Sequence, residues 1–126
     1  MLQLNYRDAK PIYEQIKEGI RHLLLTNAIA ADEKLPSVRE LASNLAINPN
    51  TIQRAYKELE LEGYVYSMKG KGTFASATDF IHKSREQELL TTFDDVVTEL
   101  FLLDEKKKKL GCRMERLEQR RIDAHG

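Results

Sequence analysis

Apolar residues recur at helical spacing in three separate parts of the first half of the chain. Between residues 11 and 26, isoleucine or leucine returns every three or four positions, with charged residues in between. Residues 38–45 and 52–59 repeat this spacing over shorter lengths. The pattern predicts three amphipathic helices around one small core.

Local sequence features mark where these helices begin. Pro11 suits the first turn of the first helix, because its missing N–H would have no partner there. Ser37, followed three positions later by Glu40, has the form of a capping box. Asn48 and Pro49 provide an N-cap residue and a proline at the first helical position. The second and third helices are therefore joined by a very short turn, which predicts a helix-turn-helix.

The third predicted helix has one apolar and one polar face. Its apolar residues, at 52, 55, 56 and 59, are expected to pack on the core. Its polar face would then be exposed and able to contact a partner. The polar residues at matching spacing are Asn50, Gln53, Arg54 and Lys57.

A β-hairpin is predicted directly after this helix. Gly63 suits the end of the helix, because glycine adopts the left-handed conformation at little cost. Residues 64–66 and 73–75 are β-prone, and the glycine-rich segment between them contains Lys69 and Lys71. A hairpin with a basic tip at this position is typical of a winged helix.

Residues 78–126 differ in character. They contain no proline, and their apolar residues indicate helix. A second helical segment is predicted to begin with Asp104 as its N-cap. Two helices alone cannot bury the broad apolar stripe of the first, so we expect the stripe to form a dimer interface. Its residues are Leu89, Leu90, Phe93, Val96, Val97, Leu100 and Phe101.

Composition adds limits to this interpretation. The chain has 126 residues, 41% apolar and 32% charged, which is typical of a folded protein. Its single cysteine, Cys112, cannot form an internal disulfide, and the sequence suggests no metal, cofactor or catalytic motif. No segment is apolar enough to span a membrane, and the N-terminus lacks the layout of a secretory signal, so we expect a cytoplasmic protein. Because no catalytic motif is recognisable, we expect that it is not an enzyme. The formal net charge of zero weakly disfavours DNA as a partner, although the predicted wing is locally basic.

Four motifs in this order and spacing resemble the GntR family of bacterial repressors, particularly its short YtrA-like branch. They are residues 11–16 (PIYEQI), 35–42 (LPSVRELA), 48–56 (NPNTIQRAY) and 69–74 (KGKGTF). The resemblance implies a mainly α fold with a small β-hairpin wing: a winged helix-turn-helix over residues 1–77 and a two-helix dimerisation segment over residues 78–126. It also implies a homodimer that binds a palindromic operator in double-stranded DNA, usually repressing its own operon, often one with an ABC transporter. The short C-terminal segment cannot hold the family's larger effector domains, and whether a small-molecule effector exists stays open.

The resemblance and the chemistry of the side chains together suggest how DNA would be read. Gln53 and Arg54 would read base edges, because Gln pairs with adenine and Arg with guanine. Helix N-termini would face phosphates, and the wing would follow the DNA backbone. Ser37 is either a DNA contact or only a helix cap. The predicted DNA contacts are Ser37, Arg39, Asn50, Thr51, Gln53, Arg54, Lys57, Lys69, Gly70, Lys71, Gly72 and Thr73.

An alternative function also fits the sequence. The same fold could serve as a protein-interaction adaptor that uses the third helix and the wing without specific DNA binding. The run Lys106–Lys109 is interpreted as a solvated helical face rather than a second DNA site. The operator, the regulated genes and the choice between repression and activation are not encoded in any recognisable pattern.

Overall fold

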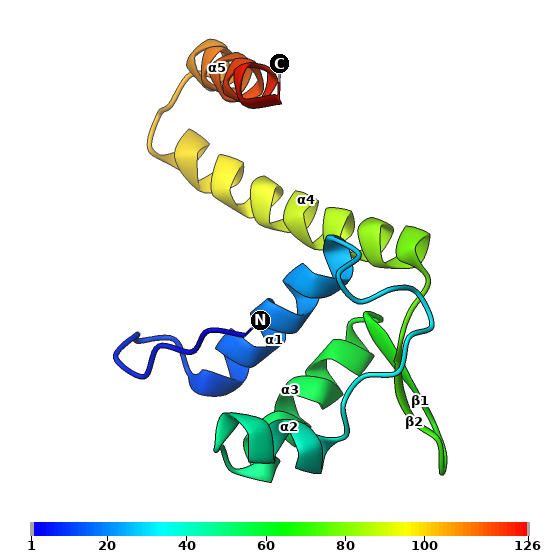
Figure 1. Cartoon of the computed structure of the whole chain (residues 1–126). Helices are drawn as coiled ribbons and strands as arrows, with labels where there is room; N and C mark the ends of the chain where they lie inside the picture. The colour runs from blue at the N-terminus through cyan, green and yellow to red at the C-terminus, as the bar shows by residue number, and fades with distance from the viewer. Residues whose placement is uncertain (1, 126) are drawn as a thin grey trace. The chain divides into compact units, whose positions relative to one another are not determined.

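The computed structural model describes residues 2–125; residues 1 and 126, the outer limits of the two predicted domains, lie outside the described residues. Five helices and one two-stranded hairpin follow one another along the chain (Figure 1). The chain divides into two compact units, Met1–Gln87 and Glu88–Gly126. The elements are α1 (Ile12–Leu25), α2 (Val38–Leu45), α3 (Pro49–Leu61), β1 (Val65–Met68), β2 (Gly72–Ala75), α4 (Thr78–Leu102) and α5 (Lys107–His125).

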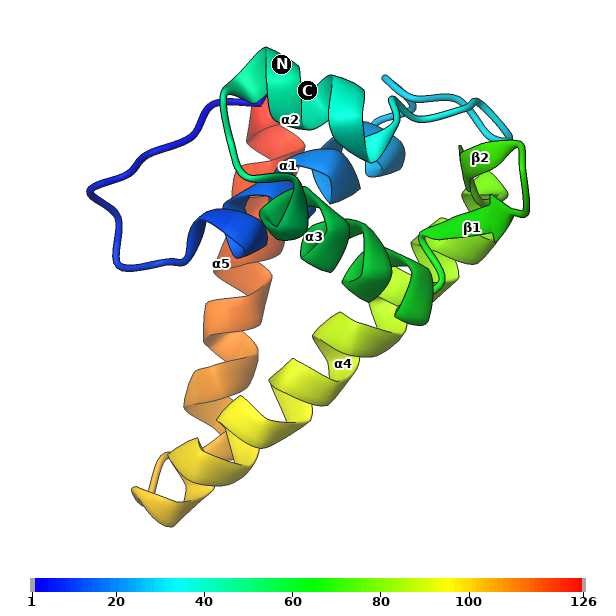
Figure 2. The ribbon, with the colours of Figure 1, turned by 90° about the horizontal axis from the view of Figure 1, so that it is seen from below.

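The N-terminal unit is built around the apolar sides of α1, α2 and α3, as the hydrophobic spacing predicted (Figure 2). Ile16 from α1 and Ile52 from α3 have no exposed surface, and Leu41 from α2 is 6% exposed. Tyr64, just before the hairpin, and Ile81 in α4 complete this core. The winged helix-turn-helix fold predicted from the sequence is confirmed.

The helix caps explain why the three helices begin and end where they do. Ser37 Oγ accepts a hydrogen bond from the Glu40 N–H at 3.1 Å, and Asn48 Oδ1 accepts one from the Asn50 N–H at 2.8 Å. Both predicted N-caps are therefore confirmed. Pro11 differs slightly from its prediction, because it precedes the helix as N-cap instead of forming its first turn.

Gly63 ends α3 in the left-handed conformation, with φ +85°. A Cβ on this residue would also lie 2.4 Å from Phe80 Cε1 in the first turn of α4. Ser84, one turn further along α4, donates a hydrogen bond to the Glu62 carbonyl at 2.8 Å. The early turns of α4 thus pack on the N-terminal unit, so the packing boundary falls after Gln87, later than the start of the helix at Thr78.

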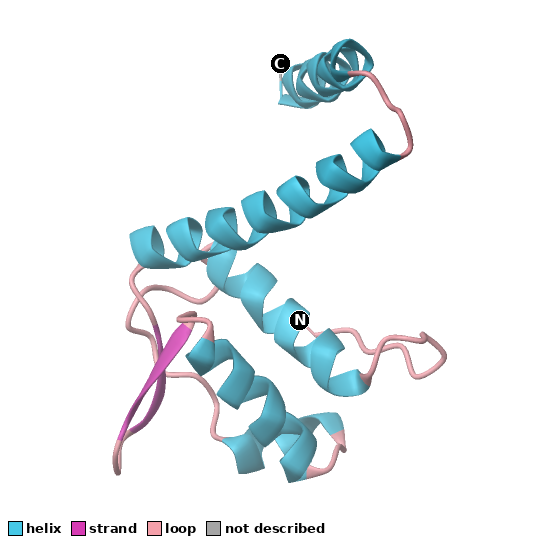
Figure 3. Ribbon diagram, turned by 180° about the vertical axis from the view of Figure 1, so that it is seen from behind, coloured by secondary structure: helices cyan, strands magenta, loops and turns pink. Residues whose placement is uncertain are grey.

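The hairpin has a third strand-like neighbour that the sequence pattern did not predict. β1 and β2 pair antiparallel and continue to the pair Met68 and Gly72, so the strands extend further toward the tip than predicted (Figure 3). The Leu35 N–H donates to the Thr73 carbonyl at 2.8 Å, and the Ala75 N–H donates to the Glu33 carbonyl at 2.9 Å. This pairing attaches the base of the wing to the segment that leads into α2.

The C-terminal unit contains the end of α4 and all of α5, as the helical pattern predicted. The N-cap prediction for Asp104 is wrong. Asp104 has φ 64° and lies in the turn that ends α4, where its N–H donates to the Phe101 carbonyl, and α5 begins only at Lys107. A short acidic residue tolerates this left-handed conformation, so the same residue type that favours an N-cap also favours the preceding turn.

The predicted dimerisation stripe is largely exposed in the single chain. Leu89, Leu90 and Phe93 are 46–50% exposed, Val96 and Phe101 are similar, and Val97 and Leu100 are partly buried.

None of the helices over the described residues is long and apolar enough to cross a membrane.

Truncating the buried face of α3 should destabilise the N-terminal unit, whereas truncating its exposed end should not. Leu59 has no exposed surface, and Leu61 on the same helix is 78% exposed. We expect Leu59→Ala to lower the free energy of unfolding by about 2–5 kcal/mol, because it removes buried methyl groups and leaves a cavity. Leu61→Ala should change it by less than about 0.5 kcal/mol. Urea unfolding of both variants tests this, and equal losses would contradict the packing of α3.

Candidate nucleic-acid interface

The surface of α3 that faces away from the core is polar and, in its N-terminal half, free of acidic residues. Ile52, Ala55, Tyr56 and Leu59 bury the opposite side of the helix. The first acidic residue on α3 is Glu58. A helix whose own first turns carry no acidic residue suits a negatively charged partner at its N-terminus. The exposed residues on this surface are Asn50, Gln53, Arg54 and Lys57, while Thr51 is partly buried.

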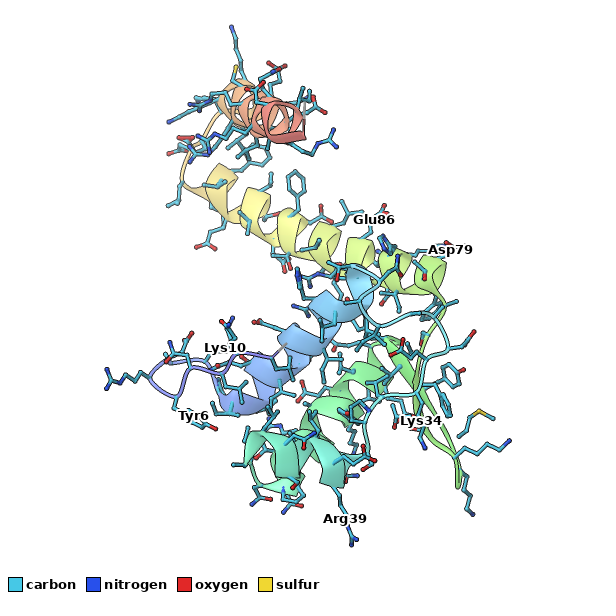
Figure 4. All side chains as sticks on the ribbon, viewed as in Figure 1. Tyr6, Lys10, Lys34, Arg39, Asp79 and Glu86 are labelled. Carbon is cyan, nitrogen blue, oxygen red and sulfur yellow. The ribbon has the colours of Figure 1, made fainter. Side chains whose placement is uncertain are left out.

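A buried tyrosine fixes the angle between α2 and α3. Tyr56 is 6% exposed, and its hydroxyl donates a hydrogen bond to the Pro36 carbonyl at 2.7 Å. Burial, assisted by the charge of Glu40, raises the pKa of Tyr56 to about 12, so the hydroxyl remains a donor at neutral pH. Because Pro36 directly precedes the N-cap residue Ser37, this bond ties the start of α2, which carries Ser37 and Arg39, to the middle of α3. Both are exposed, and Arg39 projects away from the body of the unit (Figure 4).

The acidic residues in the second half of α3 are held by other side chains. Lys17 of α1 lies 2.7 Å from Glu62 and 3.3 Å from Glu58. Burial alone would lower the pKa of Lys17, but its hydrogen bonds and charge interactions with Glu62 and Glu58 raise it above its usual value. Glu62 Oε2 is buried, and its ion pair with Lys17 compensates its charge. Glu60 accepts a hydrogen bond from Ser67 at 3.2 Å.

Arg54 is held against α1 in this structure. Its guanidinium carbon lies 3.7 Å from the centroid of the Tyr13 ring, a cation–π arrangement. Its Nε also lies 3.4 Å from Glu58 Oε2, four residues along the same helix. The side chain remains 61% exposed. Gln53, its neighbour in sequence, is exposed and makes no such contact with the described residues. The two residues predicted to read bases therefore have different surroundings.

The wing is held at its base by an aromatic stack and a hydrogen bond, and it is basic at its tip. Tyr66 and Phe74 stack across the strands with ring centroids 5.6 Å apart, and the Tyr66 hydroxyl donates to Asp32 at 2.8 Å. That hydrogen bond is the main reason the pKa of Tyr66 is raised. The tip consists of residues 69–71, and Lys69, Gly70, Lys71 and Gly72 are exposed, whereas Thr73 is partly buried.

Lys34 belongs to this basic region, although the sequence pattern did not single it out. A Cβ at Gly72 would lie 2.8 Å from Lys34 Cε, so the Lys34 side chain runs directly beside β2 (Figure 4). Lys34 forms a single isolated β-bridge with Phe74. The extended segment around it is too short to give a recognisable strand pattern in the sequence. The placement of Lys34 depends on pairing with a residue forty positions away, which no local pattern reveals.

The N-terminal unit thus brings together all of the predicted DNA contacts, on α2, α3 and the wing. Among the described residues, no cluster of His, Cys, Asp or Glu could hold a metal ion.

Comparisons with known proteins agree with this arrangement. The chain is 47% identical over 76 residues to the HTH-type transcriptional repressor YtrA of Bacillus subtilis (strain 168). This match covers 60% of this chain and 58% of the length of that protein. A GntR family transcriptional regulator from Listeria monocytogenes superimposes with a TM-score of 0.69 at 34% identity, over 88% of this chain and 98% of that one. The DNA-binding domain of AraR, in complex with operator ORR3, superimposes with a TM-score of 0.53 at 32% identity, over 59% of this chain and 89% of that one.

The family match coincides with the winged helix itself. Residues 12–75 match the model of the bacterial regulatory proteins, gntR family. This range begins at the first residue of α1 and ends at the last residue of β2. Because the match covers just over half of the chain and all of its winged helix-turn-helix, this chain belongs to the gntR family of bacterial regulatory proteins.

Proposed function

We propose that this protein is a transcription regulator that represses genes by binding a specific DNA sequence through its winged helix-turn-helix. The observation that carries this proposal is the exposed, acid-free first half of α3, which lies in the same unit as a basic wing. The similar domain of AraR is described in complex with an operator. The YtrA relative is a transcriptional repressor.

The proposed contacts divide into base readers and phosphate contacts. Helix α3 would enter the major groove with its N-terminal residues toward the base edges. There Gln53 would be the principal reader, since its amide can pair with adenine through two hydrogen bonds. Arg39 and the wing lysines would hold phosphates and fix the register of α3, and Lys34 joins them as a further contact. The remaining proposed contacts are Ser37, Asn50, Thr51, Lys57, Gly70, Gly72 and Thr73.

The proposed DNA-binding form is a homodimer on a palindromic operator. Two-fold symmetry would place two copies of α3 about 34 Å apart, which is one turn of DNA. The apolar stripe on α4 supplies the surface, because half of the area of Leu89, Leu90 and Phe93 stays exposed in the single chain. Burying such a stripe between two copies would provide the driving force for pairing.

Selection from random duplex DNA, followed by fluorescence anisotropy, tests the proposed function. We expect the selected sites to be palindromic and their affinity to fall steeply with salt, because Lys and Arg at phosphates release counterions. The slope of log affinity against log salt should be about −0.9 for each phosphate neutralised. If the protein enriches no DNA sequence and its weak affinity does not change with salt, the proposed sequence-specific DNA binding is contradicted. That result would favour a protein-interaction adaptor.

If α3 reads bases and the wing contacts phosphates, substitutions in the two elements should affect DNA binding differently. Gln53→Ala should cost roughly 1–3 kcal/mol of binding to the selected site and relax the preference at one base position. Lys71→Ala should weaken binding to all sequences alike and reduce the salt slope by about one. Lys108→Ala removes the same charge from α5 and serves as the control. Identical behaviour of the Gln53 and Lys71 variants would show that the two roles are not separate.

Arg54 is proposed to act mainly by positioning α3, through its contact with the Tyr13 ring. The sequence prediction that Arg54 reads a base stays a prediction, and the two roles give different results. If Arg54 positions the helix, Arg54→Ala and Tyr13→Leu should each weaken binding by about 2–5-fold, the worth of an exposed cation–π contact. Their effects should not add, since both variants remove the same contact.

Two measurements distinguish these roles of Arg54: DNA binding by a Tyr13 variant that keeps the ring, and the base preference of Arg54→Ala. Tyr13→Phe keeps the aromatic ring and should bind DNA like the unmodified protein. Arg54→Ala should leave the preferred base unchanged at every position of the operator. A relaxed preference at one position, seen with Arg54→Ala and absent with Tyr13→Leu, would assign Arg54 to base reading instead.

A further inference from the structure

The N-terminal unit contains an apolar cavity with a volume of about 320 Å³. Its lining comes from the N-terminal segment, from α1, α2 and α3, and from the segment between α1 and α2. Ligand sites in proteins typically measure about 300–1,000 Å³, so this cavity has room for a small molecule. The buried residues that form its floor are Ile20, Leu35, Leu41 and Tyr56.

The walls of this cavity are formed by segments whose conformations are fixed by other contacts. Asn27 follows α1 in the left-handed conformation, with φ 61°, and the Ile29 N–H donates to the Leu23 carbonyl at 3.1 Å. This turn forms one wall. Leu2 forms another and lies on Gly19 of α1, where a larger side chain would collide with it. The cavity is therefore preformed, as most ligand sites are.

The polar groups of the lining have partners within the unit. The Tyr56 hydroxyl donates to the Pro36 carbonyl at 2.7 Å, and the Glu33 carboxylate accepts a hydrogen bond from the Ala30 N–H at 3.1 Å. Glu33 and Lys34 are the charged residues of the lining, and their formal charges cancel. A charged ligand would lose its hydration here without gaining full compensation. The lining therefore favours an uncharged, apolar molecule.

One wall of the cavity is the segment of residues 33–36, which joins the wing to the helix-turn-helix. The Ala75 N–H of β2 donates to the Glu33 carbonyl at 2.9 Å, and the Leu35 N–H donates to the Thr73 carbonyl at 2.8 Å. At its other end, the segment leads directly into the N-cap of α2. A molecule packed against this segment would stabilise the arrangement of the wing and the start of α2 that the structure shows.

We propose that this cavity is a binding site for a small, uncharged, apolar molecule, and that the bound molecule strengthens DNA binding. Burial of the apolar surface of the ligand would supply the affinity. Because the cavity is preformed, its ligand favours the conformation in which the wing and α2 are held together, which is the conformation proposed to bind DNA. The effect on DNA rests on the proposed function, whereas the site itself does not.

Methyl NMR of the full-length protein, titrated with N-phenyl-1-naphthylamine, tests the site. This fluorescent molecule is uncharged and apolar, so it matches the chemistry of the lining. We expect the methyl resonances of Ile20, Leu35 and Leu41 to shift as it is added. Shifts confined to Leu89, Leu90 and the rest of the exposed apolar stripe of α4 would show adsorption elsewhere and would overturn the site.

Two phenylalanine variants provide a matched comparison. Ala28 is exposed and lines the cavity, whereas Ala31, three residues further along, is exposed and does not. Ala28→Phe places a ring at the mouth of the cavity and should weaken N-phenyl-1-naphthylamine binding, measured by fluorescence, by at least about 10-fold. Ala31→Phe should bind it like the unmodified protein. Equal affinities of the two variants would overturn the site, and circular dichroism checks that both remain folded.

Fluorescence anisotropy with the selected operator tests the effect on DNA. Saturating N-phenyl-1-naphthylamine should raise the operator affinity of the unmodified protein and of Ala31→Phe by about 5-fold, the lower end of usual coupling between sites. The operator affinity of Ala28→Phe should respond much less. By linkage, the operator should raise the affinity for N-phenyl-1-naphthylamine by the same factor.

The possible failures give distinct results. If N-phenyl-1-naphthylamine does not bind in the cavity, the whole proposal is overturned. If it binds there but operator affinity is unchanged or falls, the effect on DNA is overturned and the site remains. A protein that selects no operator would overturn the proposed function, while the NMR and fluorescence measurements would still decide whether the site exists.

Discussion

The complete burial of Ile52, Ala55 and Leu59 holds one side of α3 against the rest of the N-terminal unit, and the interface depends on this constraint. A helix fixed on one side must present its other side to solvent, in a defined register. The hydrogen bond from Tyr56 to the Pro36 carbonyl then sets where α2 begins relative to α3. Tyr56 near the middle of α3 and the left-handed Gly63 just after its end both hold the helix in place, so a partner can bind it with little reorganisation.

Electrostatics in a neutral protein are organised locally. Near the C-terminal end of α3, Lys17 pairs with Glu58 and Glu62, and Glu60 accepts a hydrogen bond from Ser67, so these carboxylates are already engaged within the unit. The wing and the neighbouring Lys34 add positive charge on the same unit. A net charge of zero is therefore compatible with a surface that attracts phosphates, because screening limits each charge to a range of about 10 Å.

The C-terminal unit follows a different principle, since its apolar side chains are about half exposed in the single chain. Exposed apolar rows of this size on a folded protein mark an interaction surface. Its charges differ between the helices: residues 88–102 of α4 carry only acidic charges, whereas α5 carries an excess of Lys and Arg.

The sequence by itself determined the helices of the N-terminal unit, both N-caps at Ser37 and Asn48, and the hairpin, because spacing, caps and glycines are local properties. It also identified the polar face of α3. Only the tertiary structure decided that Arg54 lies on Tyr13, that Lys34 lies beside the wing, and that Asp104 closes α4 instead of starting α5. The first two depend on contacts between residues about forty positions apart, and the third on a choice between two local conformations that the same residue type favours. Local patterns encode which face of a helix is polar, but the surroundings of each side chain on that face are set by elements that only folding brings together.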